Sequence, residues 1–174
     1  YAELFEPDAV WVSADTCVTA EAMGVEVKAA REDQPLAGTG TPLVRTLADA
    51  EAILPPDPVR NGRYPLMIEA TRRVRKALGD EAFIVACFDQ YPFSAACALM
   101  GIEHAMTAAI GQDNLLRVVM QKAADYAVAY GEALVKAGAD MLSGGDSPAG
   151  LLGPRLYRDV AAGPEQEVIQ RLQN

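Results

Sequence analysis

The chain has 174 residues, of which 51% are hydrophobic and 22% charged, so it can build one domain with a buried core but is short for two. Its 24 acidic and 15 basic residues give a formal net charge of -9, which disfavours binding to nucleic acid or to an anionic membrane surface. No run of about 18 apolar residues occurs, which excludes a membrane-spanning helix. Three cysteines without a CxxC spacing fit a reducing cytoplasm, where we expect the protein to reside.

The first third of the chain predicts one strand followed by short helices. Residues 8–14 are apolar and rich in β-formers, which predicts a buried strand, and residues 19–23 predict a helical turn closed by Gly24. Residues 25–40 contain glycine and proline, which favours a loop or a small hairpin. A short helix is expected over residues 46–53, and the prolines that follow it end it.

The remainder alternates between helical spacing and short apolar strands. In chain order, we expect a helix over 64–78, a strand over 82–87, helices over 92–100, 102–110 and 114–137, a strand over 139–143, a turn over 144–147 and mostly helical spacing over 154–173. Strands separated by helices favour parallel β/α units with right-handed crossovers. About three units are present, whereas a closed (β/α)8 barrel needs about 250 residues. The fold class is therefore α/β, either part of a barrel or a small open sheet.

Three acidic residues follow or end the predicted strands. Asp15 comes directly after the first strand, Asp89 after the second and Asp146 after the third. The carboxyl ends of parallel strands meet at one edge, where ligands bind, so these acids are candidates to hold N–H groups, move a proton or bind a metal. The alternative for Asp15 and Asp146 is that each caps a helix, because aspartate is favoured at that position.

Two further features lie beside these acids. Ser147 and Gly150 belong to a glycine-bearing turn in which the backbone can approach a ligand closely and hold a carboxylate. Phe93, together with Phe88 and Tyr91, could line an apolar pocket for a flat ring system, although core packing explains these aromatic residues equally well.

For the histidine, the clustered basic residues and two of the cysteines, the sequence favours structural roles over functional ones. The chain has one histidine, His104, and no cysteine pair near it, so it does not encode a complete zinc site. Arginines and a lysine gather over residues 72–76, where helical spacing favours a solvated face over a phosphate clamp. Cys87 and Cys97 lie in apolar runs typical of a core, whereas Cys17 follows an aspartate and could face a site.

Three segments together resemble the uroporphyrinogen decarboxylase superfamily, which includes the methylcobamide:coenzyme M methyltransferases. The strongest match is GADMLSGGDSPAGLLGP over residues 138–154, similar to the strand and glycine-bearing loop of that superfamily. Residues 14–24 and 88–93 are similar to two further segments, and the three occur in the same order. The resemblance implies that residues 1–174 are a single segment of a (β/α)8 barrel domain, truncated at both ends.

The resemblance also implies a tetrapyrrole or corrinoid substrate at the barrel mouth, with a corrinoid carried on a corrinoid protein as one form. The acid matching Asp15 would hold pyrrole N–H groups, since a carboxylate accepts several charge-assisted hydrogen bonds. The serine matching Ser147 would bind a substrate carboxylate, with Asp146, Gly150, Phe93 and Asp89 around the substrate. Corrinoid and zinc, where used, would depend on a C-terminal part carrying the zinc ligands, so no cofactor or metal ligand is expected in this chain.

Departures from the pattern favour the methyltransferase branch over uroporphyrinogen decarboxylation. The decarboxylase tyrosine is replaced where Cys97 and Ala98 stand, and Asp89 and Gln90 replace small residues. A non-catalytic binding or assembly module is the alternative, because half a barrel leaves unpaired edge strands and an uncovered inner surface. We accordingly expect a homo-oligomer or association with the rest of the barrel. A nucleotide-binding domain is disfavoured because GxGxxG and GxxxxGK[ST] are both absent.

Overall fold

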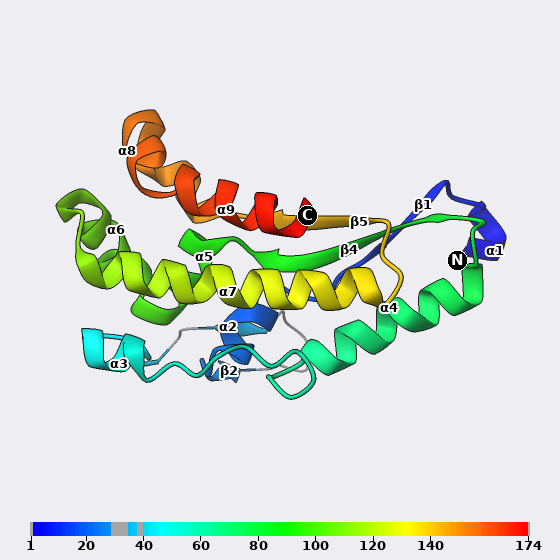
Figure 1. Cartoon of the computed structure of the whole chain (residues 1–174), viewed down its shortest axis with the longest axis horizontal. Helices are drawn as coiled ribbons and strands as arrows, with labels where there is room; N and C mark the ends of the chain where they lie inside the picture. Colours follow the sequence, from blue (N-terminus) through cyan, green and yellow to red (C-terminus); the bar gives the residue numbers. More distant parts are fainter. Residues whose placement is uncertain (1, 29–34, 38–39, 174) are drawn as a thin grey trace.

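The computed structural model describes residues 2–28, 35–37 and 40–173 (Figure 1). Its elements, in chain order, are α1 (Ala2–Phe5), β1 (Ala9–Val12), α2 (Val18–Ala22), β2 (Val27–Lys28), β3 (Leu36–Ala37), α3 (Leu47–Glu51), α4 (Tyr64–Leu78), β4 (Phe83–Gln90), α5 (Pro92–Met100), α6 (Ile102–Gly111), α7 (Asn114–Lys136), β5 (Met141–Gly145), the 3-10 helix η1 (Ser147–Leu152), α8 (Gly153–Val160) and α9 (Ala162–Gln173). This order confirms the predicted alternation of strands and helices.

The main sheet has three strands in the order β1-β4-β5, and both neighbouring pairs are parallel. Ala9 lies opposite Phe83 in the first pair, and Val85 lies opposite Met141 in the second. The three predicted strands are therefore neighbours that run the same way, and their carboxyl ends form one edge. In Figure 1 the long helix α7 runs beside β4, and α4 lies next to it.

Helix boundaries follow from proline, glycine and capping residues in the sequence. Pro65 stands in the first turn of α4, and Gly79 ends the helix at a φ of 55°, a left-handed conformation that glycine tolerates. Pro92 opens α5. Thr46 and Asp49 form a reciprocal capping box at the start of α3. The predicted bounds of α4 and α5 are confirmed.

Two strands extend further than predicted. β4 continues to Gln90, and β5 includes Gly144 and Gly145, which were predicted to form a turn. The cause is pairing across an irregularity at Phe88, where Asp89 lies opposite Gly144 and Gln90 opposite Gly145. A Cβ atom on Gly144 would lie 2.3 Å from Cζ of Phe88, so the close approach of the two strands requires glycine at this position.

The two faces of the sheet differ in burial. Ile84, Ala86 and Phe88 point to the helical side of β4 and are buried. The opposite face carries Trp11, which is 65% exposed, and Met141, which is 49% exposed, in register on either side of Val85. This face has no helical layer among the described residues, so its apolar side chains meet solvent.

Helix α7 buries more residues than any other described helix. Its buried face includes Leu115, Val119, Ala123, Tyr126 and Leu134, and Tyr130 stacks on Tyr64 of α4 with ring centroids 3.9 Å apart. The predicted loop or hairpin over residues 25–40 contains the antiparallel pair of β2 and β3, while residues 29–34 and 38–39 lie outside the described part. Among the described residues, no single helix is long and apolar enough to cross a membrane; α5 and α6 reach that length only as a pair bent by 119°.

Candidate functional site

The carboxyl edge of the sheet brings together the loops that carry the three predicted acids. Asp15 lies between β1 and α2, Asp89 is the last residue but one of strand β4, and Asp146 lies between β5 and η1. Because β4 is the central strand, Asp89 stands between the loops of its two neighbours. The sequence placed these residues at strand ends, and the parallel order of the strands puts those ends side by side.

Asp15 is held by Arg63, a residue that the sequence analysis did not single out. Arg63 Nη1 donates to Oδ2 at 2.5 Å and Nη2 to Oδ1 at 3.1 Å, while the backbone N–H of Cys17 also reaches Oδ1 at 2.8 Å. The same guanidinium contacts Glu21 through Nε. Burial by itself would raise the pKa of Asp15, but the hydrogen bonds from Arg63 and Cys17 outweigh it and hold the pKa below its ordinary value.

Asp89 occupies a less solvated and more strained position. Its backbone has a φ of 76°, in the left-handed region that few non-glycine residues adopt, and the residue is only 8% exposed. Its Oδ2 accepts the backbone N–H of Thr19 at 2.8 Å. Burial, together with a smaller effect of the charge of Asp15, raises the pKa of Asp89 to about 6, against the hydrogen bonds from Thr19. Asp89 is thus a carboxyl that exchanges a proton closer to neutral pH than an ordinary aspartate does.

Asp146 has one oxygen well bonded and one without a donor. The backbone N–H and the hydroxyl of Ser94 both donate to Oδ1 at 2.7 Å. Oδ2 is buried and has no hydrogen-bond partner. Burial, together with a smaller effect of the Glu165 carboxyl of α9, raises the pKa of Asp146 to about 6, against the hydrogen bonds from Ser94. Tyr157 donates to Glu165 Oε2 at 2.5 Å.

Asp89 and Asp146 each cap the helix of the preceding β/α unit. Asp89 accepts the N–H of Thr19 in the first turn of α2, and Asp146 accepts that of Ser94 in the first turn of α5. Neither helix has a side-chain cap of its own, and Asp146 makes no side-chain cap to η1, which follows it. The capping alternative is therefore correct for Asp146 in a modified form, because the capped helix precedes the acid in the sequence.

The other predicted site residues divide between surface and core. Ser147 and Gly150 are exposed on η1, beside Asp146. Phe93 is fully buried within α5, and Phe88 packs edge-to-face on Tyr91 with ring centroids 5.0 Å apart. These aromatic rings take the core-packing alternative, so Phe93 offers no surface to a ligand here.

Residues outside the candidate site mostly take the structural roles expected of them. Among the basic residues over 72–76, Arg72 and Arg73 pair with Glu69 on the surface of α4, and Arg75 bonds to Gly138 and Asp140. His104 and the thiol-bearing residues join no metal site, because no group of three or more His, Cys, Asp or Glu residues in the described part could hold an ion. The resemblance places its zinc ligands in a C-terminal part, so they are not expected among these residues.

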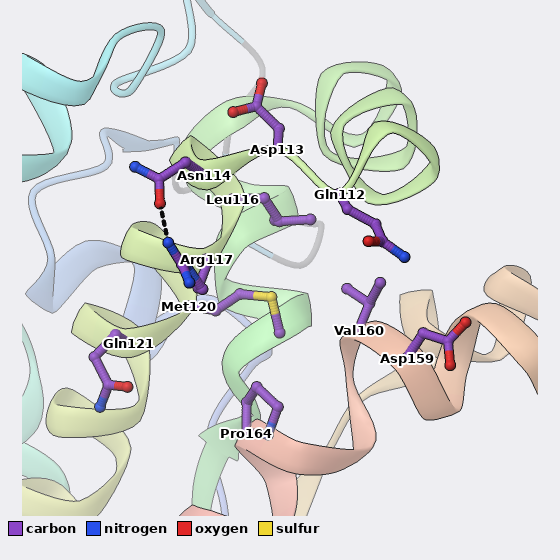
Figure 2. Close-up of a pocket in the computed structure, with 10 residues that line it drawn as sticks. All are labelled: Gln112, Asp113, Asn114, Leu116, Arg117, Met120, Gln121, Asp159, Val160 and Pro164. Carbon is purple, nitrogen blue, oxygen red and sulfur yellow. Dashed lines mark hydrogen bonds between the residues drawn. The ribbon is translucent and has the colours of Figure 1, made fainter.

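A separate groove of about 460 Å³ lies between the start of α7 and the α8–α9 turn (Figure 2). Figure 2 shows Asp159 and Val160 on one side of it and Gln112 and Leu116 on the other. None of the three strand-end acids lines this groove. Its location distinguishes it from the candidate site at the sheet edge.

The comparison with known families matches residues 1–174, the whole length of the chain, to uroporphyrinogen decarboxylase (URO-D). The chain belongs to the uroporphyrinogen decarboxylase family. The resemblance seen in the sequence is thereby confirmed.

Relatives in this family carry two different names. A methylcobamide:CoM methyltransferase MtaA from Methanosarcina barkeri (strain Fusaro / DSM 804) is 28% identical over 143 residues, covering 81% of this chain and 41% of the relative. A uroporphyrinogen decarboxylase from Acidiphilium cryptum (strain JF-5) is 31% identical over 175 residues, covering 97% of this chain and 46% of the relative. The chain spans about half the length of the curated relatives it matches.

A solved structure supports the fold assignment. A methyltransferase from Methanosarcina mazei superposes with a TM-score of 0.87 at 27% identity, covering 99% of this chain and 51% of that chain. The three parallel β/α units therefore form part of a β/α barrel, and the predicted fold class of this family member is confirmed.

We expect this family member to lose stability as the pH rises from about 4 to 7. The pKa values of Asp89 and Asp146 are about 6 against an ordinary 3.8, so the folded state binds these protons more tightly than the unfolded state. The stability that they contribute is complete below the unfolded pKa and is lost as pH rises through the folded pKa, at about 1–2 kcal/mol per group. Urea unfolding at several pH values measures the change.

The double variant D89N/D146N is the control for this trend. It removes both titrating carboxyls, so its unfolding free energy should change much less between pH 4 and 7. Asp15 acts in the opposite sense, because its lowered pKa affects stability only below about pH 4. Unfolding that is independent of pH in the parent chain, or an equal slope in the double variant, would contradict the assignment.

Proposed function

We propose that the chain contributes residues at the carboxyl edge of its sheet to the site of a corrinoid-dependent methyltransferase in the uroporphyrinogen decarboxylase family. The observation that carries this proposal is the engagement of Asp15. Arg63 and Cys17 send three hydrogen bonds to its two oxygens, which leaves little capacity to accept several pyrrole N–H groups. Decarboxylase-like binding of a macrocycle centre by this acid would require it to leave Arg63.

Two further features support the methyltransferase branch. Cys97 and Ala98 stand where the resemblance places the decarboxylase tyrosine, and no described side chain replaces that hydroxyl at these positions. Among the relatives, the methyltransferases of Methanosarcina barkeri and Methanosarcina mazei are named for methyl transfer. A methylcobamide, free or carried on a corrinoid protein, is accordingly the substrate that we propose.

Within this site, the chain's residues would bind and orient the substrate. Ser147 is exposed at the start of η1, where its hydroxyl can donate to a carboxylate or amide group on the rim of the ring. Gly150 has no atoms within 4 Å of a notional Cβ, so the loop leaves room for a ligand beside it. Asp89, with a pKa of about 6, would exchange a proton at the centre of the edge.

Titration of the chain with methylcobalamin, and separately with uroporphyrinogen, tests the proposal. We expect saturable heat with methylcobalamin, weakened about tenfold in S147A and unchanged in T107A, which removes an exposed hydroxyl on α6. Binding of uroporphyrinogen alone would overturn the proposal in favour of uroporphyrinogen decarboxylase. Binding of neither would overturn it in favour of a non-catalytic module.

The sheet exposes an apolar face on the side away from the helices. Trp11, Phe83 and Met141 are each about half or more exposed on the face away from the helices, and no charged side chain lies among the strand residues of that face. The match covers 51% of the solved methyltransferase, so about half of that protein has no counterpart in this chain. We propose that this face is an interface, which in the purified chain is covered by a second copy.

Trp11 is the only tryptophan in the sequence and reports on this interface. We expect light scattering to show a dimer and Trp11 emission to shift to shorter wavelength as the chain concentration rises. M141K should abolish both effects, whereas L66K, on the exposed surface of α4, should leave them unchanged. A folded monomer whose emission does not depend on concentration would refute the interface.

A further inference from the structure

Thr19, the second residue of α2, forms hydrogen bonds with two other elements. Its backbone N–H donates to Asp89 Oδ2 at 2.8 Å, and its hydroxyl donates to the carbonyl oxygen of Phe88 at 3.3 Å. The hydroxyl of Tyr64, the first residue of α4, donates to Thr19 Oγ1 at 3.3 Å. Thr19 and Tyr64 are both 0% exposed, so water does not compete for these bonds.

The β4 residues that Thr19 contacts form the irregular end of that strand. The pairing with β5 skips Phe88, as at a β-bulge, and Asp89 then lies opposite Gly144. Asp89 has a left-handed backbone, which costs energy in a residue other than glycine and persists only where the surrounding structure holds it. Thr19 binds the carbonyl oxygen that precedes Asp89 and the Asp89 carboxyl itself, so it holds this segment at two points.

We propose that Thr19 is a positioning residue that holds the Asp89 carboxyl and its strained backbone at the carboxyl edge of the sheet, with Tyr64 orienting the Thr19 hydroxyl. A hydroxyl has one proton to donate. Because Thr19 Oγ1 accepts from Tyr64, its own proton is directed to the Phe88 carbonyl oxygen. The use of Asp89 for proton exchange rests on the proposed function, whereas the contacts of Thr19 do not.

Replacing Thr19 leaves the charges around Asp89 unchanged, because Thr19 is uncharged. The titratable and charged groups that interact with Asp89 are Asp15, Arg63, Cys17, Cys87, Tyr64 and Tyr130. Burial raises the pKa of Asp89, and the hydrogen bonds from Thr19 oppose this rise. Loss of the Thr19 hydroxyl should therefore raise the pKa of Asp89 further.

Carbon-13 NMR titration of the aspartate carboxyls, with D89N used to assign the Asp89 signal, tests the hydroxyl contact without any ligand. We expect Asp89 to titrate near pH 6 in the parent chain. T19V keeps the shape of the side chain but removes its hydroxyl, and it should raise the proton affinity of Asp89 about threefold or more. T19S loses the methyl group but keeps the hydroxyl, so the midpoint should be unchanged.

Two further variants complete the titration. T107V makes the same replacement as T19V at an exposed hydroxyl on α6 and should leave the Asp89 midpoint unchanged. Y64F removes the donor to Thr19 Oγ1 and should shift the midpoint in the same direction as T19V, by a smaller amount. It provides the decisive measurement if T19V does not fold.

Amide hydrogen exchange of Thr19 tests the bond to the carboxyl. In D89N the side-chain oxygen can still accept from the Thr19 N–H, so protection should be kept, whereas D89A should lose it about tenfold or more. An unchanged midpoint in T19V (or in Y64F, where T19V is unfolded), a shift in T19S as large as in T19V, or equal exchange in D89N and D89A would overturn the inference. None of these measurements uses a corrinoid, so a failure of methylcobalamin binding would overturn the proposed function and leave them unaffected.

Discussion

Replacing Gly144 by alanine is expected to destabilise the fold by about 2–3 kcal/mol, because the new methyl group would overlap the Phe88 ring. Its Cβ would lie 2.3 Å from Cζ and 2.7 Å from Cε2 of that ring. The ring has little room to move, since Phe88 is 2% exposed and packs edge-to-face on Tyr91. To relieve this overlap, β5 would have to move away from β4. The Asp146 loop follows β5 and would move with it. Urea unfolding of G144A against the parent chain measures the loss.

Gly150 provides the matched control for this substitution. It lies in the same strand-end segment, but a Cβ there would meet no atom within 4 Å, and its φ is not in the left-handed region. G150A should therefore change the unfolding free energy by less than about 0.5 kcal/mol. Equal effects of the two variants would show that the strands separate freely and that the contact between Gly144 and Phe88 does not constrain them.

Substituting Arg63 by methionine is expected to cost about 2–4 kcal/mol, because Asp15 would lose its only described cationic partner while remaining largely buried. The Asp15 side chain is 10% exposed and Arg63 is 28% exposed, so this ion pair is shielded from solvent far more than a surface pair. Glu21 would lose the same guanidinium, which adds to the effect. Thermal unfolding of R63M at pH 7 measures the change.

Two variants separate the loss of the ion pair from a general effect of removing arginine. R72M removes an arginine that is 59% exposed and pairs with Glu69 on the surface of α4, so we expect a loss below about 1 kcal/mol. The double variant R63M/D15N removes the unpaired carboxylate and should recover part of the stability. A loss in R63M no greater than in R72M, or no recovery in the double variant, would show that Asp15 tolerates ionisation alone.

The helices were predictable because their ends depend on local chemistry. Pro65 and Gly79 define α4, and Pro92 opens α5, with Gly101 following it at a φ of 81°. The ends of β4 and β5 were not predictable in the same way. Asp89 and Gln90 are polar residues that join the strand only because Gly144 and Gly145 pair with them, and this pairing depends on tertiary structure.

In the candidate site, too, some features follow from local sequence and others depend on tertiary contacts. The position of each acid after a strand follows from apolar runs in the sequence, and the parallel order then brings the strand ends together. The partners come from elsewhere: Arg63, which bonds Asp15, precedes α4, and Ser94, which bonds Asp146, lies within α5. No motif marks them, because each acts through a contact with an element remote in the sequence.

The parallel topology also has a consequence for the order of folding. Ala9 pairs with Phe83, and Val85 with Met141, so each strand pair closes a long loop before it gains its hydrogen bonds. Helices such as α7 need only local contacts and are expected to form much earlier. The bonds from Thr19 to Asp89 and from Ser94 to Asp146 cannot form until neighbouring units dock. Refolding should therefore be slow, with the two carboxylate caps among the last native contacts to appear.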